Sequence, residues 1–255
     1  MCLLLISYKN HLEYPLIVAA NRDEFYKRPT EKACYWKEHP YLLAGRDIEA
    51  GGTWLGITKS GRFAAITNYR DIKSIKEKAP SRGALTLGFL TSELSPVKYG
   101  QNLYERADEY NGYNLLFSDL KSFYYFSNQT KELIKLSAGI YGLSNHLLDT
   151  PWPKVAKSKE AFIKATSNER ISPDSLFEIL SDDREAPDDQ LPETGLSIEL
   201  ERAVSPVFIK SDQYGTRSST VLLLNNKNEA IFIEKSLDTI KKQWVEKRFE
   251  FKLKY

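Results

Sequence analysis

The sequence predicts an α+β fold with largely antiparallel sheets and helices packed outside them. Two observations support this prediction: the chain runs through strands, then helices, then strands, and the helix-like segments stand in groups between sets of strands. The regular strand–helix alternation that is typical of a parallel sheet does not appear. The chain has 255 residues and shows no internal repeat or low-complexity linker, so we expect a single domain over residues 1–255.

Apolar runs predict the first strands. Residues 2–8 and 15–20 are continuous apolar runs, as in strands covered on both faces, and the short polar segment between them predicts a hairpin. Residues 53–58 and 62–68 form a second predicted hairpin, because the three-residue connection between them ends in a glycine suited to a left-handed conformation. The glycine pair just before it, at residues 51–52, predicts a close approach of the backbone to another segment.

Proline positions and helical spacing predict the helices. The prolines at residues 96, 151 and 173 are typical of a first helical turn. Residues 182–193 are acidic and contain two prolines, which predicts a surface loop. The predicted helices are 81–94, 95–109, 151–166 and 173–180, and the remaining predicted strands are 113–117, 122–127, 132–136, 219–224, 229–234 and 248–253.

Composition excludes several classes of protein. Lys+Arg is 36 and Asp+Glu is 34, a net charge of +2, so no overall field draws the chain to nucleic acid or to an anionic membrane. Two cysteines and three histidines at these spacings fit neither a disulfide framework nor a zinc finger. No apolar stretch approaches the roughly 20 residues of a membrane span. We therefore expect a soluble cytoplasmic protein without a metal site; the sequence leaves its oligomeric state open.

The sequence contains none of the familiar catalytic motifs, and Cys2 is the candidate nucleophile that remains. Removal of Met1 would leave Cys2 at the chain start, and its own α-amino group, with an ordinary pKa of about 7.7–8.0, would serve as general base for the thiol. No histidine would then be required. The alternative interpretation is a small apolar residue that begins a buried strand.

The segment Asn21-Arg22-Asp23-Glu24 places four polar residues at the end of a predicted strand, beside the strand that starts with Cys2. Alternation sends Asn21 and Asp23 to one face and Arg22 and Glu24 to the other. An arginine beside carboxylates is suited to holding a thiolate or an anionic ligand group. The alternative is a solvated strand end with an ion pair that contributes little to the stability of the fold.

These segments belong to a series of motifs that resembles the transport and Golgi organisation protein 2 family, also called the NRDE-motif family. The resemblance covers nearly the whole chain. Its blocks are Met1-Cys2, Ala20-Asn21-Arg22-Asp23-Glu24-Phe25, Arg28-Pro29, Gly51-Gly52-Thr53-Trp54-Leu55-Gly56, Thr67-Asn68-Tyr69, Ser81-Arg82-Gly83, Tyr110-Asn111-Gly112-Tyr113-Asn114-Leu115, Tyr141-Gly142-Leu143-Ser144-Asn145, Pro151-Trp152, Tyr214-Gly215-Thr216-Arg217-Ser218-Ser219-Thr220 and Phe249-Glu250-Phe251.

The resemblance implies an αββα sandwich like that of the N-terminal-nucleophile (Ntn) hydrolases, in which a leading cysteine attacks an amide. It implies Cys2 as nucleophile, Arg22 and Asp23 as its charged partners, Asn145 as part of an oxyanion hole and Arg217 as a late arginine. In those hydrolases two residues separate the Arg and the Asp, whereas Arg22 and Asp23 are adjacent. Alternation points adjacent side chains apart, so in a regular strand at most one of the two lines the site.

The resemblance also leads to two classes of function. The first is a binding and trafficking protein for haem or acyl-coenzyme A, and the second is a Cys2-dependent amidohydrolase or acyltransferase. A scaffold for protein partners is a third interpretation. Further ligand contacts are expected from Asn21, Glu24, Trp54, Asn68 and Arg82. Haem would be a transported ligand rather than a certain cofactor, and its candidate axial ligands are Cys2, Cys34, His11, His39, His146 and tyrosine.

Overall fold

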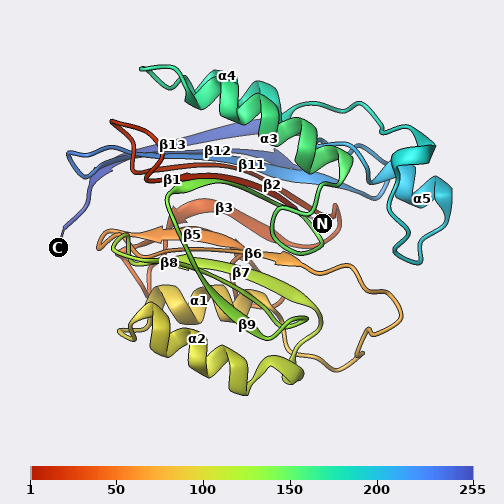
Figure 1. Ribbon diagram of the computed structural model, residues 1–255, viewed down its shortest axis with the longest axis horizontal. Coiled ribbons are helices and arrows are strands. Elements are labelled where there is room, and N and C mark those ends of the chain that lie inside the picture. Colours follow the sequence, from red (N-terminus) through yellow and green to blue (C-terminus); the bar gives the residue numbers. More distant parts are fainter. Residues whose placement is uncertain (1, 255) are drawn as a thin grey trace. The chain divides into compact units, whose positions relative to one another are not determined.

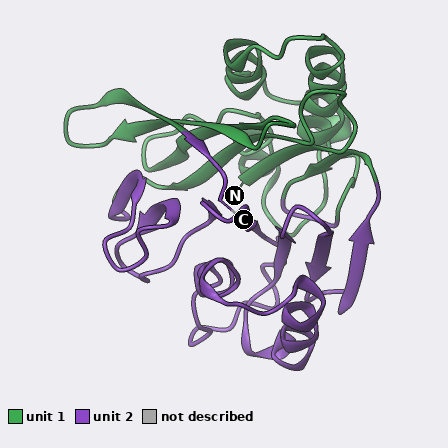
Figure 2. Cartoon of the chain, turned by 90° about the vertical axis from the view of Figure 1, so that its left-hand side faces the viewer, with its two compact units in different colours: residues 1–27, 138–144, 148–250 green, residues 28–137, 145–147, 251–255 purple. Residues whose placement is uncertain are grey.

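The computed structural model describes residues 2–254, which divide into two compact units (Figure 2). The first unit comprises residues 2–27, 138–144 and 148–250. The second comprises residues 28–137, 145–147 and 251–254. Each unit has its own sheet, its own helices and its own apolar core, so each is described by itself.

The sheet of the first unit has the strand order β10-β1-β2-β11-β12-β13. Helices α3 (Pro153–Thr166) and α4 (Pro173–Leu180) cover one face of this sheet, which we call the helix face (Figure 1). The unit also contains the short helices η2 (Asp188–Gln190) and α5 (Ile198–Ala203). The strands are β1 (Cys2–Tyr8), β2 (Leu16–Phe25), β10 (Gly139–Leu143), β11 (Tyr214–Leu224), β12 (Glu229–Asp238) and β13 (Gln243–Lys252).

Alternation along β1 and β2 fixes which side chains meet the helices. Leu3 and Leu5 of β1 and Ile17 of β2 belong to the apolar core that also contains Phe162 of α3 and Leu176 of α4. Side chains one position along each strand must lie on the opposite face. Cys2 and Arg22 are therefore on the face turned away from α3 and α4, while Asp23 is on the helix face.

The second unit has a sheet whose strands follow one another in sequence order, β3-β4-β5-β6-β7-β8-β9. Helices α1 (Gly83–Thr91) and α2 (Pro96–Glu105) pack on it, followed by the short helix η1 (Ala107–Glu109). Its core is aromatic: the ring of Phe89 meets those of Tyr99 and Phe117 edge to face, 5.2 and 5.1 Å away. The strands are β3 (Thr30–Tyr35), β4 (Leu42–Asp47), β5 (Leu55–Thr58), β6 (Phe63–Asn68), β7 (Tyr113–Ser118), β8 (Phe123–Ser127) and β9 (Glu132–Leu136).

Local signals explain several boundaries. The Ser95 side chain accepts a hydrogen bond from the Lys98 backbone N–H, and Pro96 opens α2, as its Ser-Pro sequence predicts. Gly61 has φ +86° in the predicted hairpin between β5 and β6, the left-handed conformation that this connection requires. The predicted hairpin of β11 and β12 is also present.

Some predictions from the sequence need correction. The second strand does not stop at residue 20: β2 continues to Phe25, because β11 pairs with it through Glu24 and Phe25, so Asn21–Glu24 lie inside a strand. The predicted surface loop 182–193 contains η2. Strands β3, β4 and β10 and helix α5 were not predicted, since their short, mixed sequences have no clear period and their strands are fixed by pairing with neighbours.

The last strand, β13, lies at one edge of the first unit's sheet. Most of its side chains are exposed, and charged residues occupy half of its positions. Its contacts with β12 include an edge-to-face pair of Phe249 with Phe232 and an ion pair of Glu246 with Lys235. Among residues 2–254, none of the helices has the length and apolar character needed to cross a membrane.

Candidate functional site around Cys2

Cys2 begins β1 and is partly buried. The Ser144 hydroxyl, at the end of β10, donates to the Cys2 carbonyl oxygen at 2.9 Å and so anchors the start of the strand. Burial raises the pKa of the Cys2 thiol; the nearby Asp23 carboxylate acts in the same direction, while Arg22 acts against it. The thiol is therefore protonated at neutral pH.

Arg22 and Asp23 point to opposite faces of the sheet, as alternation predicts. Arg22 is directly across from Cys2 in the β1–β2 pairing, and its Nη2 lies 3.6 Å from Oε2 of Glu24. Asp23 is on the helix face, where its Oδ1 accepts a hydrogen bond from the Thr216 hydroxyl at 2.7 Å. Burial raises the pKa of the Asp23 carboxyl. Arg22 alone of the two shares the face of Cys2.

Arg217 is the extra residue of a β-bulge in β11. Thr216 pairs with Asp23 and Ser218 pairs with Arg22, so Arg217 has no partner position on β2. Its Nη1 donates to the carbonyl oxygens of Phe25 and Tyr26, at 2.9 and 3.1 Å. Burial lowers the pKa of the Arg217 guanidinium, and the like charge of Arg22 lowers it further.

The bulge brings two buried arginines into electrostatic range of one another. Arg22 is 5% exposed and Arg217 is 6% exposed, and Glu24 is the carboxylate that acts on both. The side of the sheet that carries Cys2 therefore holds two guanidinium groups, together with the carboxylates of Glu24 and the buried Glu234. A buried guanidinium pair of this kind is suited to binding a carboxylate or a phosphate.

A polar row crosses the sheet from Cys2. The register aligns Cys2 with Arg22, Arg22 with Ser218, and Ser218 with Ser236, so all four lie on the same face. The Ser236 hydroxyl donates to the buried Glu234 carboxylate at 2.6 Å. The Ser218 hydroxyl is 4% exposed and makes no hydrogen bond with the residues that the structure describes. It faces the same side as the Arg22 guanidinium.

Asn21 has a different environment from the one expected of a ligand contact. It lies on the helix face, where its Nδ2 donates to the carbonyl oxygens of Leu180 and Val207, both at 2.8 Å. Its Oδ1 accepts from the Ser219 hydroxyl at 2.6 Å. These bonds tie β2 to the end of α4 and to β11, which is a structural role.

The second unit holds the remaining predicted site residues. Asn145 is fully buried, and its Nδ2 donates to the Asn68 carbonyl oxygen at 2.8 Å, so these two predicted residues do meet. Arg82 donates to the Gly112 carbonyl oxygen at 3.0 Å. Trp54 packs against the apolar core of this unit, over Gly45.

The candidate haem ligands are dispersed. Cys2 and His11 belong to the first unit, and Cys34, His39 and His146 to the second. His146 stacks at a tilt on Tyr69, with ring centroids 5.0 Å apart, and burial lowers the pKa of its imidazole, which favours the neutral form that coordinates iron. Within residues 2–254, no group of three or more His, Cys, Asp or Glu side chains is arranged to hold a metal ion.

Sequence reasoning missed Ser218 and Thr216. Both stand in the block Tyr214–Thr220 beside Arg217, but hydroxyl residues in a strand carry no distinguishing signal. Only the register of β11 against β2, with its bulge, shows that Thr216 holds Asp23 and that Ser218 stands next to Arg22.

Comparison with known proteins gives a consistent result. The model of the family "Transport and Golgi organisation 2" matches residues 1–239. The Mus musculus "Transport and Golgi organization 2 homolog" is 36% identical, over 94% of this chain and 93% of its own. The Homo sapiens homolog is 35% identical over the same shares, and the Drosophila melanogaster protein is 29% identical over 88% and 87%.

A solved structure is similar over almost its whole length. It is the mutant C2A conjugated bile acid hydrolase from Clostridium perfringens, with a TM-score of 0.53, 12% sequence identity, and coverage of 99% of this chain and 97% of the hydrolase. At this identity the likeness concerns the fold alone. Together with the two antiparallel sheets, it confirms the predicted α+β fold of the Ntn-hydrolase kind.

Proposed function

The chain belongs to the Transport and Golgi organisation 2 family, and from that premise we propose that it binds and carries a small molecule with an anionic group, haem or acyl-coenzyme A. The observation that carries the proposal is the pair of buried arginines, Arg22 and Arg217, beside Cys2. Haem presents two propionates and coenzyme A presents phosphates, and both groups are natural partners of guanidinium.

The state of the Cys2 thiol favours a carrier over an enzyme. A cysteine nucleophile reacts as the thiolate, and reactive cysteines have a lowered pKa. Burial instead raises the pKa of Cys2. Asp23, which would act on a catalytic centre at Cys2, is turned to the helix face and held by Thr216. Binding needs only the charge of the arginines and a cavity for the ligand.

A second candidate function is a Cys2-dependent amidohydrolase or acyltransferase. The specific observation in its favour is that Cys2 stands at the first position of β1, directly across from Arg22, whose positive charge acts to lower the pKa of the thiol. With Met1 removed, the Cys2 amine would supply the general base that the histidines do not.

The test compares ligand binding in matched variants of the full chain. Haemin binding is followed by the Soret band and palmitoyl-coenzyme A binding by calorimetry. We expect the wild type to bind at least one of them and the variant Arg22→Gln/Arg217→Gln to bind it at least tenfold more weakly. Arg248→Gln is the matched control, because Arg248 is exposed on β13 and pairs with Glu250. Melting temperatures and the charge-retaining Arg22→Lys show whether a loss reflects charge or folding.

The same samples separate the two candidate functions. Amide and thioester substrates are assayed with the wild type and with Cys2→Ala, and intact mass shows whether Met1 is present. Under the carrier proposal, ligand binding survives in Cys2→Ala and no substrate turns over. Turnover that disappears in Cys2→Ala, in a chain that lacks Met1, would replace the carrier by the hydrolase. The proposal also places the protein in the cytoplasm, which fractionation of cells expressing the tagged chain tests.

A further inference from the structure

The turn between β12 and β13 presents two apolar side chains to water. Ile240 lies in the turn and is 92% exposed, and Trp244, at the second position of β13, is 42% exposed. Single exposed apolar side chains are ordinary on protein surfaces, but an indole and a branched aliphatic chain this close in sequence form a small apolar surface. We call residues 240–244 the β12–β13 tip.

The backbone of the tip is fixed by an aspartate that precedes it. Asp238 Oδ1 accepts hydrogen bonds from the backbone N–H groups of Ile240 and Lys241, at 3.2 and 3.1 Å. This is the side-chain turn that a short aspartate favours. The Ile240 side chain is therefore held at a defined place in the turn, exposed to water.

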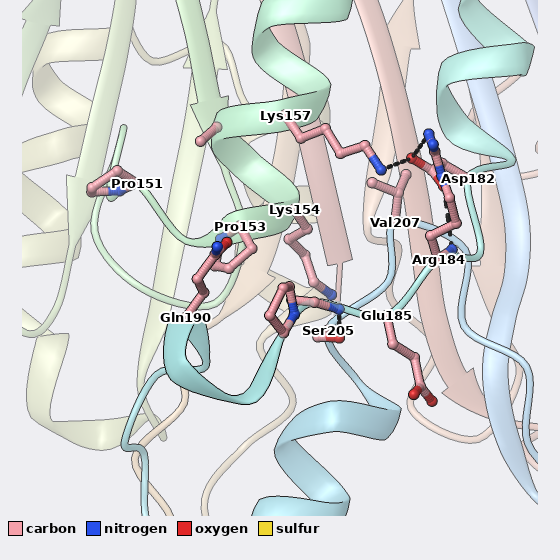
Figure 3. Close-up of a pocket in the computed structure, with 13 residues that line it drawn as sticks. Pro151, Pro153, Lys154, Lys157, Asp182, Arg184, Glu185, Gln190, Ser205 and Val207 are labelled. Atoms are coloured by element: carbon pink, nitrogen blue, oxygen red, sulfur yellow. Dashed lines mark hydrogen bonds and ion pairs between the residues drawn. The ribbon is translucent and has the colours of Figure 1, made fainter.

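Trp244 is supported from a neighbouring segment. Its ring packs at a tilt on that of Phe208, with centroids 5.5 Å apart. The Phe208 N–H donates to the Asp182 carbonyl oxygen at 2.8 Å. The Asp182 carboxylate is in turn held by ion pairs with Lys157 and Arg184, each at 2.7 Å (Figure 3). The indole thus has a firm base and still exposes part of its surface.

Two lysines stand between the apolar groups. Lys241 and Lys242 are exposed, and neither forms an ion pair with any residue of the described range 2–254. The nearest carboxylates in sequence are already engaged: Asp238 holds the turn, and Glu246 Oε2 lies 3.8 Å from the Lys235 Nζ. Both ammonium groups are therefore available to negative charge outside the protein, although the whole chain has a net charge of only +2.

We propose that the β12–β13 tip docks on the surface of an anionic lipid membrane. Trp244 and Ile240 would enter the headgroup region, where an amphipathic indole ring is favoured. Lys241 and Lys242 would pair with the anionic groups of the lipids. Either signal alone gives marginal binding, and the two together give reversible attachment.

Nucleic acid is the other anionic partner that lysines and aromatic rings can bind. The tip favours a membrane, because its most exposed side chain is Ile240. A branched aliphatic chain offers no ring for a base to stack on, whereas it is readily buried at the boundary between headgroups and acyl chains.

The tip lies at the end of the sheet where Cys2 is located. Strand β12 ends at Asp238, just beyond Ser236, and Ser236 belongs to the row that the register builds from Cys2 through Arg22. Docking would bring the lipid surface to this end of the first unit, where an amphiphilic ligand of the arginine pair could pass to or from the membrane. Membrane binding itself does not depend on the function proposed above.

The test measures co-sedimentation of the full-length chain with lipid vesicles, without added ligand. We expect binding to phosphatidylcholine vesicles that contain about 30% phosphatidylserine, weakened by salt and about tenfold lower on phosphatidylcholine alone. Lys241→Gln/Lys242→Gln should lower binding to the anionic vesicles about tenfold or more. Ile240→Ser should lower it several-fold. All three side chains are exposed, so these variants keep the fold.

The opposite end of the same sheet supplies the matched control. Leu12 is 93% exposed in the β1–β2 connection, and Asn226 of the β11–β12 turn donates to its carbonyl oxygen, next to the exposed Lys227. Leu12→Ser/Lys227→Gln therefore removes a similar leucine and lysine, and it should leave vesicle binding unchanged.

Fluorescence locates the contact. Brominated lipid in the anionic vesicles should quench tryptophan emission of the wild type, and Trp244→Phe should remove that quenching. Arg22→Gln/Arg217→Gln should bind vesicles like the wild type, so vesicle binding and ligand binding can fail separately.

Several outcomes would overturn the proposal. They are equal binding to neutral and anionic vesicles, unchanged binding in the lysine variant or in Ile240→Ser, loss of binding in the control variant, and quenching that persists in Trp244→Phe. Binding of a single-stranded oligonucleotide in place of vesicles would assign the tip to nucleic acid instead.

Discussion

The ionisation of Cys2 is the residue property on which the choice between carrier and enzyme depends. Burial raises the pKa of its thiol, so the thiolate is scarce at neutral pH and increases only as the pH rises beyond the ordinary value of a thiol. We expect the alkylation rate of Cys2 by iodoacetamide, in a Cys34→Ser background, to be well below that of free cysteine at pH 7–8 and to climb at higher pH. A thiol already ionised at pH 7 would contradict the raised pKa and favour the nucleophile.

Two adjacent serines of β11 provide a paired prediction. The Ser219 hydroxyl donates to the buried Asn21 Oδ1, so Ser219→Ala should lower the free energy of unfolding by about 1–3 kcal/mol. The Ser218 hydroxyl makes no such bond with any described residue, so Ser218→Ala should leave stability nearly unchanged. Urea unfolding of both variants gives the comparison.

Ser218 stands next to Arg22 on the face of Cys2, so the ligand proposed for the arginine pair lies within its reach. We expect Ser218→Ala to weaken haemin or palmitoyl-coenzyme A binding severalfold and Ser219→Ala to weaken it less. The reverse order, or a marked loss of stability in Ser218→Ala, would show that Ser218 serves the fold and not the ligand.

At the scale of elements, the glycine pair before β5 shows what a sequence motif can specify. The sequence predicts a close backbone approach there, and Gly52 confirms it: an added Cβ would lie 2.5 Å from the Gly83 carbonyl carbon at the start of α1. We expect Gly52→Ala to destabilise the protein by about 1–3 kcal/mol, because a rigid backbone must shift. Gly51→Ala is the control for steric contact, since its Cβ meets nothing within 4 Å and its cost comes only from φ +73°.

Thermal unfolding of the two glycine variants tests this prediction. Destabilisation of Gly52→Ala no greater than that of Gly51→Ala would contradict the contact with Gly83.

Sequence reasoning found the strands with long apolar runs, such as β1 and β7, because their burial requires a sheet. Strand β3 was missed because its sequence is half polar and only pairing with β4 makes it a strand. Alternation correctly separated Arg22 from Asp23. The bulge at Arg217 and the burial of Lys154 could not be predicted from the sequence, because both depend on segments far away in the chain.

At the scale of the whole molecule, the two sheets differ in the sequence distance of their pairings. The second unit's sheet joins strands in sequence order, whereas the first unit's sheet pairs β2 near the start of the chain with β11 near its end. Long loops must close before such distant strands pair, which slows their formation. The prediction of one domain over residues 1–255 stays a prediction beside this division into two compact units.

We therefore expect the second unit's sheet to form first during refolding. Pulsed hydrogen exchange with mass spectrometry should show protection of the amides of β5 to β8 before those of β2 and β11. Simultaneous protection of both sheets, or earlier protection of β11, would contradict this order.

The exposed edge strand β13 has a consequence for association between copies of the chain. An edge strand offers unpaired backbone groups on which another chain can extend the sheet. Strand β13 carries the charged residues Glu246, Lys247, Arg248 and Glu250. A second copy that paired with this edge would have to desolvate these side chains in order to form backbone hydrogen bonds. The charges on β13 thus oppose edge-to-edge association of sheets, and neutral substitutions along this strand would allow it to template aggregation.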